Sequence, residues 1–122
     1  MRFQTYLAAA LAGAAALLIA GAASAHAHLV NSTPAANATV AAPKTISLTF
    51  NEKLTPAFSK FELVMPAMNA MAVSVKTAVS KDGLTIVGTP KAALMPGAYK
   101  INWHAATADG HKMDGAVDFK VK

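Results

Sequence analysis

The chain has 122 residues, contains no cysteine, and carries 11 lysine and arginine residues against six aspartate and glutamate residues, a formal net charge of +5. The lack of cysteine excludes disulfides and thiolate chemistry, so a soft metal ligand in this chain has to be methionine. The lysines are scattered singly and do not alternate with aromatic residues, so the charge favours solubility and gives no support for a nucleic-acid partner.

The first 25 residues have the three-part form of a secretory signal peptide. Met1 and Arg2 give a short positive end, residues 7–20 are almost entirely small or aliphatic, and Ala23-Ser24-Ala25 is an A-x-A cleavage site. An uncleaved membrane anchor is the alternative, because residues 3–25 are uncharged and long enough to span a bilayer. Their core is dominated by weakly apolar alanine, so we predict cleavage after Ala25, which leaves residues 26–122 as one domain.

The rest of the chain has the pattern of short strands separated by turn residues. Residues 44–50 alternate polar and apolar with period two, which predicts a strand buried on one face. Further strands are expected near residues 29–30 and over 61–65, 72–79, 84–88, 99–103 and 117–121, with proline or glycine between them. About seven strands at this spacing predict a single all-β domain, a β-sandwich or small barrel. We expect the aromatic residues in its core: Phe50, Phe61, Tyr99, Trp103 and Phe119, with Phe58 as the one doubtful member.

Two histidines stand at the predicted new N-terminus. Cleavage after Ala25 makes His26 the first residue, and its α-amine and imidazole Nδ1 can then chelate a metal ion. A flat set of nitrogen donors suits Cu(II). His28 offers a second, mutually exclusive Cu(II) mode through the amine, two backbone amides and its own imidazole. The remaining alternative is that both histidines are merely solvated.

A second candidate is Asp109-Gly110-His111. Gly110 marks a turn, so the carboxylate and the imidazole can reach one point and complete a tetragonal site begun by His26. Asp-Gly is also ordinary turn chemistry, which leaves a purely structural role open. A Ser-His-Asp hydrolase is disfavoured because the chain has no nucleophile motif such as G-x-S-x-G. We expect His104 to be a surface histidine.

The third candidate is a group of three methionines at every third position: Met65, Met68 and Met71. Pro66 argues against a helix, and with Asn69 it indicates an exposed loop. Three thioethers in such a loop are soft donors suited to Cu(I). The alternative is that these methionines fill gaps in the core.

These segments together resemble the CopC family of periplasmic copper-binding proteins over residues 26–122. The resemblance lies in H-A-H-L-V-N-S-T-P-A at 26–35, L-T-F-N-E-K-L at 48–54, V-M-P-A-M-N-A-M at 64–71 and P-G-A-Y-K-I-N-W at 96–103. D-G-H-K-M-D-G-A-V-D-F-K-V at 109–121 is the most specific of these segments. The resemblance implies a seven-stranded Greek-key β-barrel or sandwich similar to cupredoxins.

The resemblance also implies a site and a role. Cu(II) would be held by the amine and imidazole of His26 together with Asp109 and His111, and Cu(I) by the methionine loop. The loop here departs from the fullest family pattern, since it has three methionines and no histidine. The implied role is carriage and sequestration of copper in the periplasm by a monomeric, non-enzymatic protein, often beside an inner-membrane copper-import protein. A copper oxygenase built on the same chelate and an Ig-like interaction module without metal are the alternatives.

Overall fold

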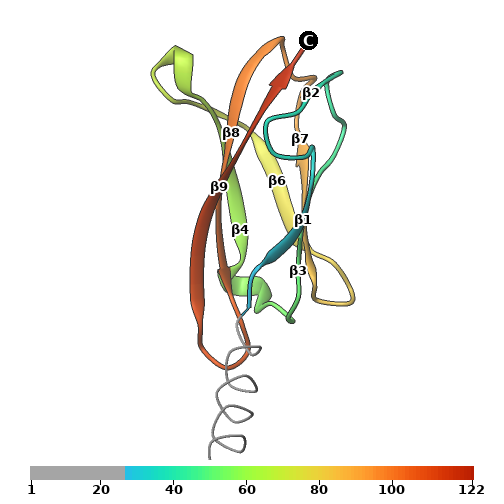
Figure 1. The fold of residues 1–122 in the computed structure, drawn as a ribbon, viewed down its shortest axis with the longest axis vertical. Helices are drawn as coiled ribbons and strands as arrows, with labels where there is room; N and C mark the ends of the chain where they lie inside the picture. Colours follow the sequence, from blue (N-terminus) through green and yellow to red (C-terminus); the bar gives the residue numbers. More distant parts are fainter. Residues whose placement is uncertain (1–26) are drawn as a thin grey trace, which may run out of the picture.

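The computed structural model describes residues 27–122, which form two β-sheets packed face to face (Figure 1). The four-stranded sheet has the order β1 (Leu29–Thr33), β3 (Ile46–Phe50), β7 (Thr85–Pro90) and β6 (Val75–Val79). The five-stranded sheet has the order β2 (Thr39–Val40), β9 (Lys112–Val121), β8 (Gly97–Ala106), β4 (Lys60–Met65) and β5 (Met71–Val73). Two short 3-10 helices, η1 (Pro56–Phe58) and η2 (Pro66–Met68), flank β4. Within residues 27–122 there is no helix long and apolar enough to cross a membrane.

The predicted all-β sandwich is confirmed, with nine strands in the described residues where seven were expected. The single strand expected over residues 72–79 is divided at Ser74 into β5 and β6, which belong to opposite sheets. The two-residue strand β2 pairs in parallel with β9 and is too short to give a periodic pattern. The predicted signal peptide (residues 1–25) and His26 lie outside the described residues and stay predictions.

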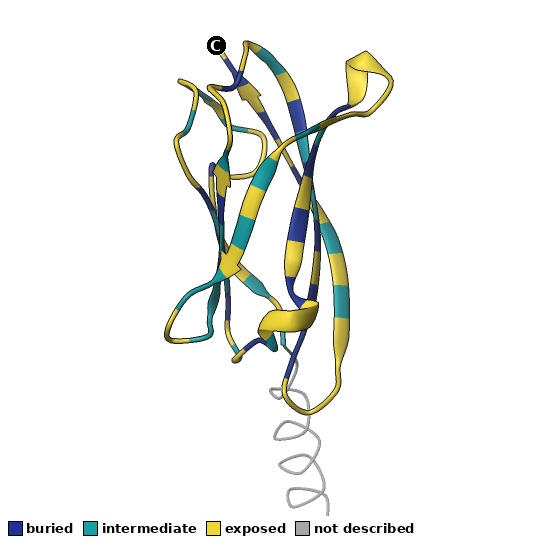
Figure 2. Ribbon diagram, turned by 180° about the vertical axis from the view of Figure 1, so that it is seen from behind, coloured by how far each residue is buried: buried dark blue, intermediate teal, exposed yellow. Residues whose placement is uncertain are grey.

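The core follows from the alternation of the strand sequences. In β3, the side chains of Ile46, Leu48 and Phe50 are buried while the residues between them are half-buried. Figure 2 shows this alternation of buried and exposed positions along the strands. The expected core aromatics are buried, and Phe50 packs edge-on against Trp103 with 5.1 Å between ring centroids. Phe58 is the exception, with 66% of the residue exposed.

One close approach in the core depends on glycine. Gly115 of β9 is the cross-strand partner of Trp103 of β8. A Cβ at position 115 would lie 2.4 Å from Trp103 Cζ2, closer than two non-bonded carbon atoms can approach. The indole ring therefore occupies the space in which a side chain at this position would stand.

The long strands β8 and β9 set the length of the sandwich. Each has ten residues, and at roughly 3.3 Å per residue each spans about 30 Å. The turn between them lies at one end of the molecule, beside the start of β1, whereas η2 lies at the other end (Figure 1). The turn that carries Asp109 and His111 and the segment that carries the three methionines are thus at opposite ends of the described sandwich.

Candidate metal centre

A tight turn over residues 107–111, the D-G-H turn, joins β8 to β9. Thr107 N donates to His111 O at 2.9 Å, and Gly110 N donates to Thr107 O at 3.0 Å. Gly110 has a φ of +91°, a left-handed conformation that glycine adopts without steric cost. These backbone bonds fix the positions from which the side chains of Asp109 and His111 extend.

The side chains of Asp109 and His111 contact each other, and the metal site expected at this pair stays a prediction. His111 Nδ1 lies 3.0 Å from Asp109 Oδ2. Both side chains are largely exposed, 57% for Asp109 and 69% for His111. A carboxylate oxygen and an imidazole nitrogen at one accessible point are suitable donors for a tetragonal Cu(II) ion.

Thr107 helps to position the Asp109 carboxylate of this pair, a role that was not predicted from the sequence. Thr107 is buried, and its hydroxyl donates a short hydrogen bond to Asp109 Oδ1. This bond is the main cause that lowers the pKa of Asp109 below its ordinary value, and the backbone N–H of His111 lowers it further. The signal in the sequence is a threonine two residues before an Asp-Gly pair, a spacing at which side chains bond within turns.

His28 directly precedes β1 in the chain, and the start of β1 lies at the same end of the sandwich as the turn between β8 and β9 (Figure 1). His28 N donates to Asn51 Oδ1 at 2.7 Å, and Asn51 N donates to His28 O at 3.2 Å. The backbone is therefore anchored to the end of β3 at this point. The predicted ligand His26 stands two residues earlier, outside the described residues.

The D-G-H turn supplies two metal donors and needs more. Among residues 27–122, no group of three or more histidine, cysteine, aspartate or glutamate side chains is arranged to hold a metal ion. A Cu(II) ion at the pair would require at least one further ligand from elsewhere, since four-coordinate or tetragonal geometry is usual for it.

The methionine segment is divided by the structure. Met65 ends β4, is only 4% exposed, and is the cross-strand partner of Met71, which is exposed at the start of β5. Met65 and Met71 line a cavity of about 260 Å³ together with Met95, which comes from the loop before β8. Met68 is exposed on η2 and is not among the described residues that line this cavity. Two of the three predicted methionines therefore share a cavity lining with Met95.

Met95 is anchored through its backbone. The buried Tyr99 donates from its hydroxyl to Met95 O at 2.6 Å. Burial raises the pKa of Tyr99, which therefore keeps its proton and remains the donor. Met113, a further methionine among the described residues, pairs with Ala105 at the start of β9, next to the D-G-H turn.

The sequence model of the CopC domain matches residues 29–122. The chain belongs to the CopC family. Copper resistance protein C of Xanthomonas campestris pv. juglandis is 42% identical over 113 residues, which cover 88% of this chain and 89% of the relative. Copper resistance protein C of Pseudomonas syringae pv. tomato is 46% identical over 114 residues, which cover 89% and 90%.

Solved structures agree with this assignment. The crystal structure of PcoC, described as a methionine-rich copper resistance protein from Escherichia coli, gives a TM-score of 0.73 at 38% identity and covers 80% of this chain and 100% of PcoC. The crystal structure of CopC from Methylosinus trichosporium OB3b gives a TM-score of 0.72 at 26% identity, covering 80% and 94%. The resemblance to the CopC family predicted from the sequence is confirmed.

This CopC-family domain has a second histidine–aspartate pair. His104 of β8 and Asp114 of β9 are cross-strand partners, and Nδ1 of the histidine lies 2.5 Å from Oδ1 of the aspartate. The predicted surface position of His104 is confirmed, since its side chain is 47% exposed. The pair lies on the outer face of the five-stranded sheet, because its neighbours Trp103 and Ala105 point into the core.

Proposed function

We propose that this CopC-family chain is an exported copper-binding protein that carries and sequesters copper in copper resistance. The observation that carries the proposal is the exposed Asp109–His111 pair, in which the Thr107 hydroxyl bonds the carboxylate and lowers the pKa of Asp109. An anionic oxygen beside an imidazole nitrogen suits Cu(II). The relatives named as copper resistance protein C support the same role.

The proposed Cu(II) ligands are the α-amine and Nδ1 of His26, a carboxylate oxygen of Asp109, and His111. The amine becomes available only when a signal peptide is cleaved after Ala25 on export to the periplasm. The position of the D-G-H turn beside the start of β1 favours this set (Figure 1). A carboxylate is ionised near neutral pH, so Asp109 needs no deprotonation to bind Cu(II), whereas an α-amine, with an ordinary pKa of about 7.7–8.0, has to lose a proton.

The alternative mode through His28 is disfavoured by a hydrogen bond. In that mode Cu(II) would replace the proton of the His28 backbone amide. That proton is donated to Asn51 Oδ1 at 2.7 Å, so this bond would be lost, while the bond from Asn51 N to His28 O would remain. We therefore propose His26, and not His28, as the ligand.

For Cu(I), we propose a thioether site made of Met65, Met71 and Met95. Thioethers select Cu(I) among the biological copper states. The cavity lined by these three residues supports this set over the three consecutive methionines of the loop. Met68 then serves as the control position, because it shares the segment but not the cavity lining.

We propose a carrier rather than an enzyme, acting as a monomer that exchanges copper with an inner-membrane import protein. An ion held on a protruding, exposed turn is accessible to a second protein. A copper oxygenase is the alternative, and peroxide-dependent turnover of a polysaccharide by the loaded protein would overturn the carrier proposal. An interaction module without metal is the third possibility.

The deciding experiment is the intact mass of the exported protein with and without Cu(II), followed by competition with a Cu(II) chelator. The expected species begins at His26 and gains one Cu(II) ion. A chain that begins elsewhere would refute the amine ligand. Failure to retain Cu(II) against a mild competitor would favour the interaction module.

The Cu(I) site is tested separately with Cu(I) competition under reducing conditions. Met95→Leu and Met71→Leu should weaken Cu(I) binding and leave Cu(II) binding unchanged. Met68→Leu should change neither. If Met68→Leu weakens Cu(I) as much as Met95→Leu does, the ligands are the consecutive loop methionines instead.

A further inference from the structure

A hollow of about 340 Å³ adjoins the D-G-H turn. It is lined by residues from η1, β4, β8 and the start of β9: Ala57, Phe58, Lys60, His104, Ala105, Ala106 and Lys112. Thr55 N donates to Ala106 O at 2.7 Å, and Leu54 forms a β-bridge with Thr107. Lys112 and Ala106 directly follow and precede the turn. The hollow and the proposed Cu(II) site are therefore adjacent surfaces at one end of the sandwich.

The exposure of Phe58 is built into the fold. Its segment is fixed to β8 on both sides of Phe58, because Thr55 N donates to Ala106 O at 2.7 Å and Ala106 N donates to Ser59 Oγ at 3.1 Å. Figure 2 shows η1 as an exposed segment near the turn. A large aromatic ring held outward at the edge of a hollow is the kind of anchor around which protein interfaces form.

The rim of the hollow is basic. Lys60 and Lys112 are both exposed, and Lys112 pairs across the strands with Ala106 at its edge. His104 lies between the lysines and is engaged by Asp114, the acidic group that faces it from β9. Among the described residues, the lining thus carries two lysines and no carboxylate, so the hollow stays positive even beside Asp114, and bound copper would add to this charge. Such a surface is complementary to carboxylates.

We infer that this hollow docks an acidic segment of a protein partner, with an apolar side chain of the partner against Phe58, so that the partner's own ligands reach the copper at the D-G-H turn. The inference rests on the proposed function, because it names the kind of partner that exchanges copper at that site. Complementary charge mainly accelerates encounter, so its effect is on the rate of transfer rather than on copper affinity.

The test uses the exported protein loaded with Cu(II) and two synthetic acceptor peptides. Both carry the same free-amine Gly-Gly-His chelating head, followed either by glutamates around one leucine or by lysines around one leucine. The rate of Cu(II) transfer is measured by stopped flow at low and high ionic strength. We expect the acidic peptide to accept copper about 10-fold faster or more at low ionic strength, with the difference lost at high salt.

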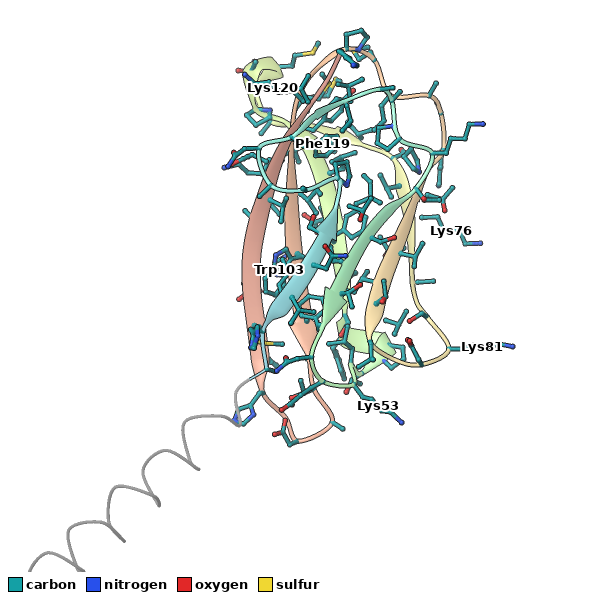
Figure 3. All side chains as sticks on the ribbon, turned by 45° about the vertical axis from the view of Figure 1, so that its right-hand side comes forward. Lys53, Lys76, Lys81, Trp103, Phe119 and Lys120 are labelled. Atoms are coloured by element: carbon teal, nitrogen blue, oxygen red, sulfur yellow. The ribbon has the colours of Figure 1, made fainter. Side chains whose placement is uncertain are left out.

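Matched variants locate the effect. The double variant Lys60→Glu, Lys112→Glu should abolish the preference for the acidic peptide, and Phe58→Ser should slow transfer to it. The control is Lys76→Glu with Lys81→Glu, which changes the net charge equally. Figure 3 shows these two lysines pointing away from the sandwich on the side opposite β9. A preference that survives the first double variant, or that both double variants reduce equally, overturns the inference.

A second measurement separates this inference from the proposed function. Amide NMR spectra of the metal-free protein with the acidic tail alone should shift at residues 57–60, 104–106 and 112. If Cu(II) is retained but neither the transfer preference nor these shifts occur, the docking inference fails while the copper proposal stands. If the protein fails to retain Cu(II) but shows the shifts, the copper proposal fails while the docking of an acidic segment stands. A third measurement tests whether the protein instead binds vesicles of anionic phospholipid through Lys60 and Lys112 and shows no preference for the acidic peptide. That result would overturn the inference of a protein partner and indicate a membrane surface.

Discussion

Replacing Thr107 by valine tests whether a residue that does not itself bind copper organises the proposed Cu(II) site. Valine keeps the size and branching of the buried side chain and removes the hydroxyl that bonds Asp109 Oδ1. The other donor to that oxygen is His111 N at 3.4 Å, a distance longer than a normal hydrogen bond. The carboxylate of the variant is therefore oriented mainly by its contact with His111 Nδ1 at 3.0 Å, and its position is less firmly fixed.

Loss of a side chain that orients a metal ligand typically weakens metal affinity by about 10- to 100-fold. Asp109 and His111 are 57% and 69% exposed, so water can replace the lost hydroxyl in part. We therefore expect a loss near the lower limit, about 10-fold, in Cu(II) affinity measured by chelator competition. In the metal-free variant, the pKa of Asp109 should rise toward its ordinary value because its main lowering bond is gone, which carboxyl NMR titration measures.

The matched control is Thr49→Val. Thr49 also has a part-buried hydroxyl, which bonds the Thr85 hydroxyl at 3.1 Å within the four-stranded sheet. This variant should leave both the Cu(II) affinity and the Asp109 titration unchanged. Unchanged Cu(II) affinity in a well-folded Thr107→Val variant would refute the idea that this threonine organises the site.

Three further predictions concern packing, acid stability and the N-terminus. Gly115→Ala places a Cβ 2.4 Å from the single tryptophan, Trp103. The variant should therefore lower the free energy of unfolding by about 1–3 kcal/mol in urea titrations and shift the tryptophan fluorescence. A urea midpoint equal to that of the wild type would contradict the close approach of the indole ring to position 115. The Ser80 hydroxyl lowers the pKa of Asp82 below 3.8, so the ionised carboxylate stabilises the fold above this pH, and the contribution is lost as pH falls through the lowered pKa. Asp82→Asn should accordingly flatten the dependence of the urea midpoint on pH in the acid range, and an unchanged profile would show that the turn does not couple to this titration. One extra residue ahead of His26 should separate the amine from its imidazole and greatly weaken Cu(II) binding, and equal affinity would show that the proposed chelate is wrong.

Local patterns in the sequence predicted what depends on local geometry. The alternation in residues 44–50 predicted β3, and Gly110 predicted a turn from which Asp109 and His111 could reach one point; in the structure Nδ1 and Oδ2 of these side chains lie 3.0 Å apart. Both follow from backbone geometry over a few residues, without knowledge of the rest of the fold.

Features that depend on distant segments were not predictable in this way. Met95 joins Met65 and Met71 only because the loop before β8 packs beside the β4–β5 turn. The division of residues 72–79 at Ser74 arises because the chain passes from one sheet to the other, which leaves no mark on the hydrophobic pattern. Phe58 was expected with reservation among the core aromatics, and its outward position is set by hydrogen bonds to β8.

The length of β8 and β9 has a consequence for how copper would move. The D-G-H turn and the methionine cavity are separated by strands that each span about 30 Å at roughly 3.3 Å per residue. If both ends take copper, one ion cannot be shared between them, and an ion that changes oxidation state at one end has to leave the molecule to reach the other. The two ends of the domain would then bind copper independently, and different partners could load and empty them at the same time.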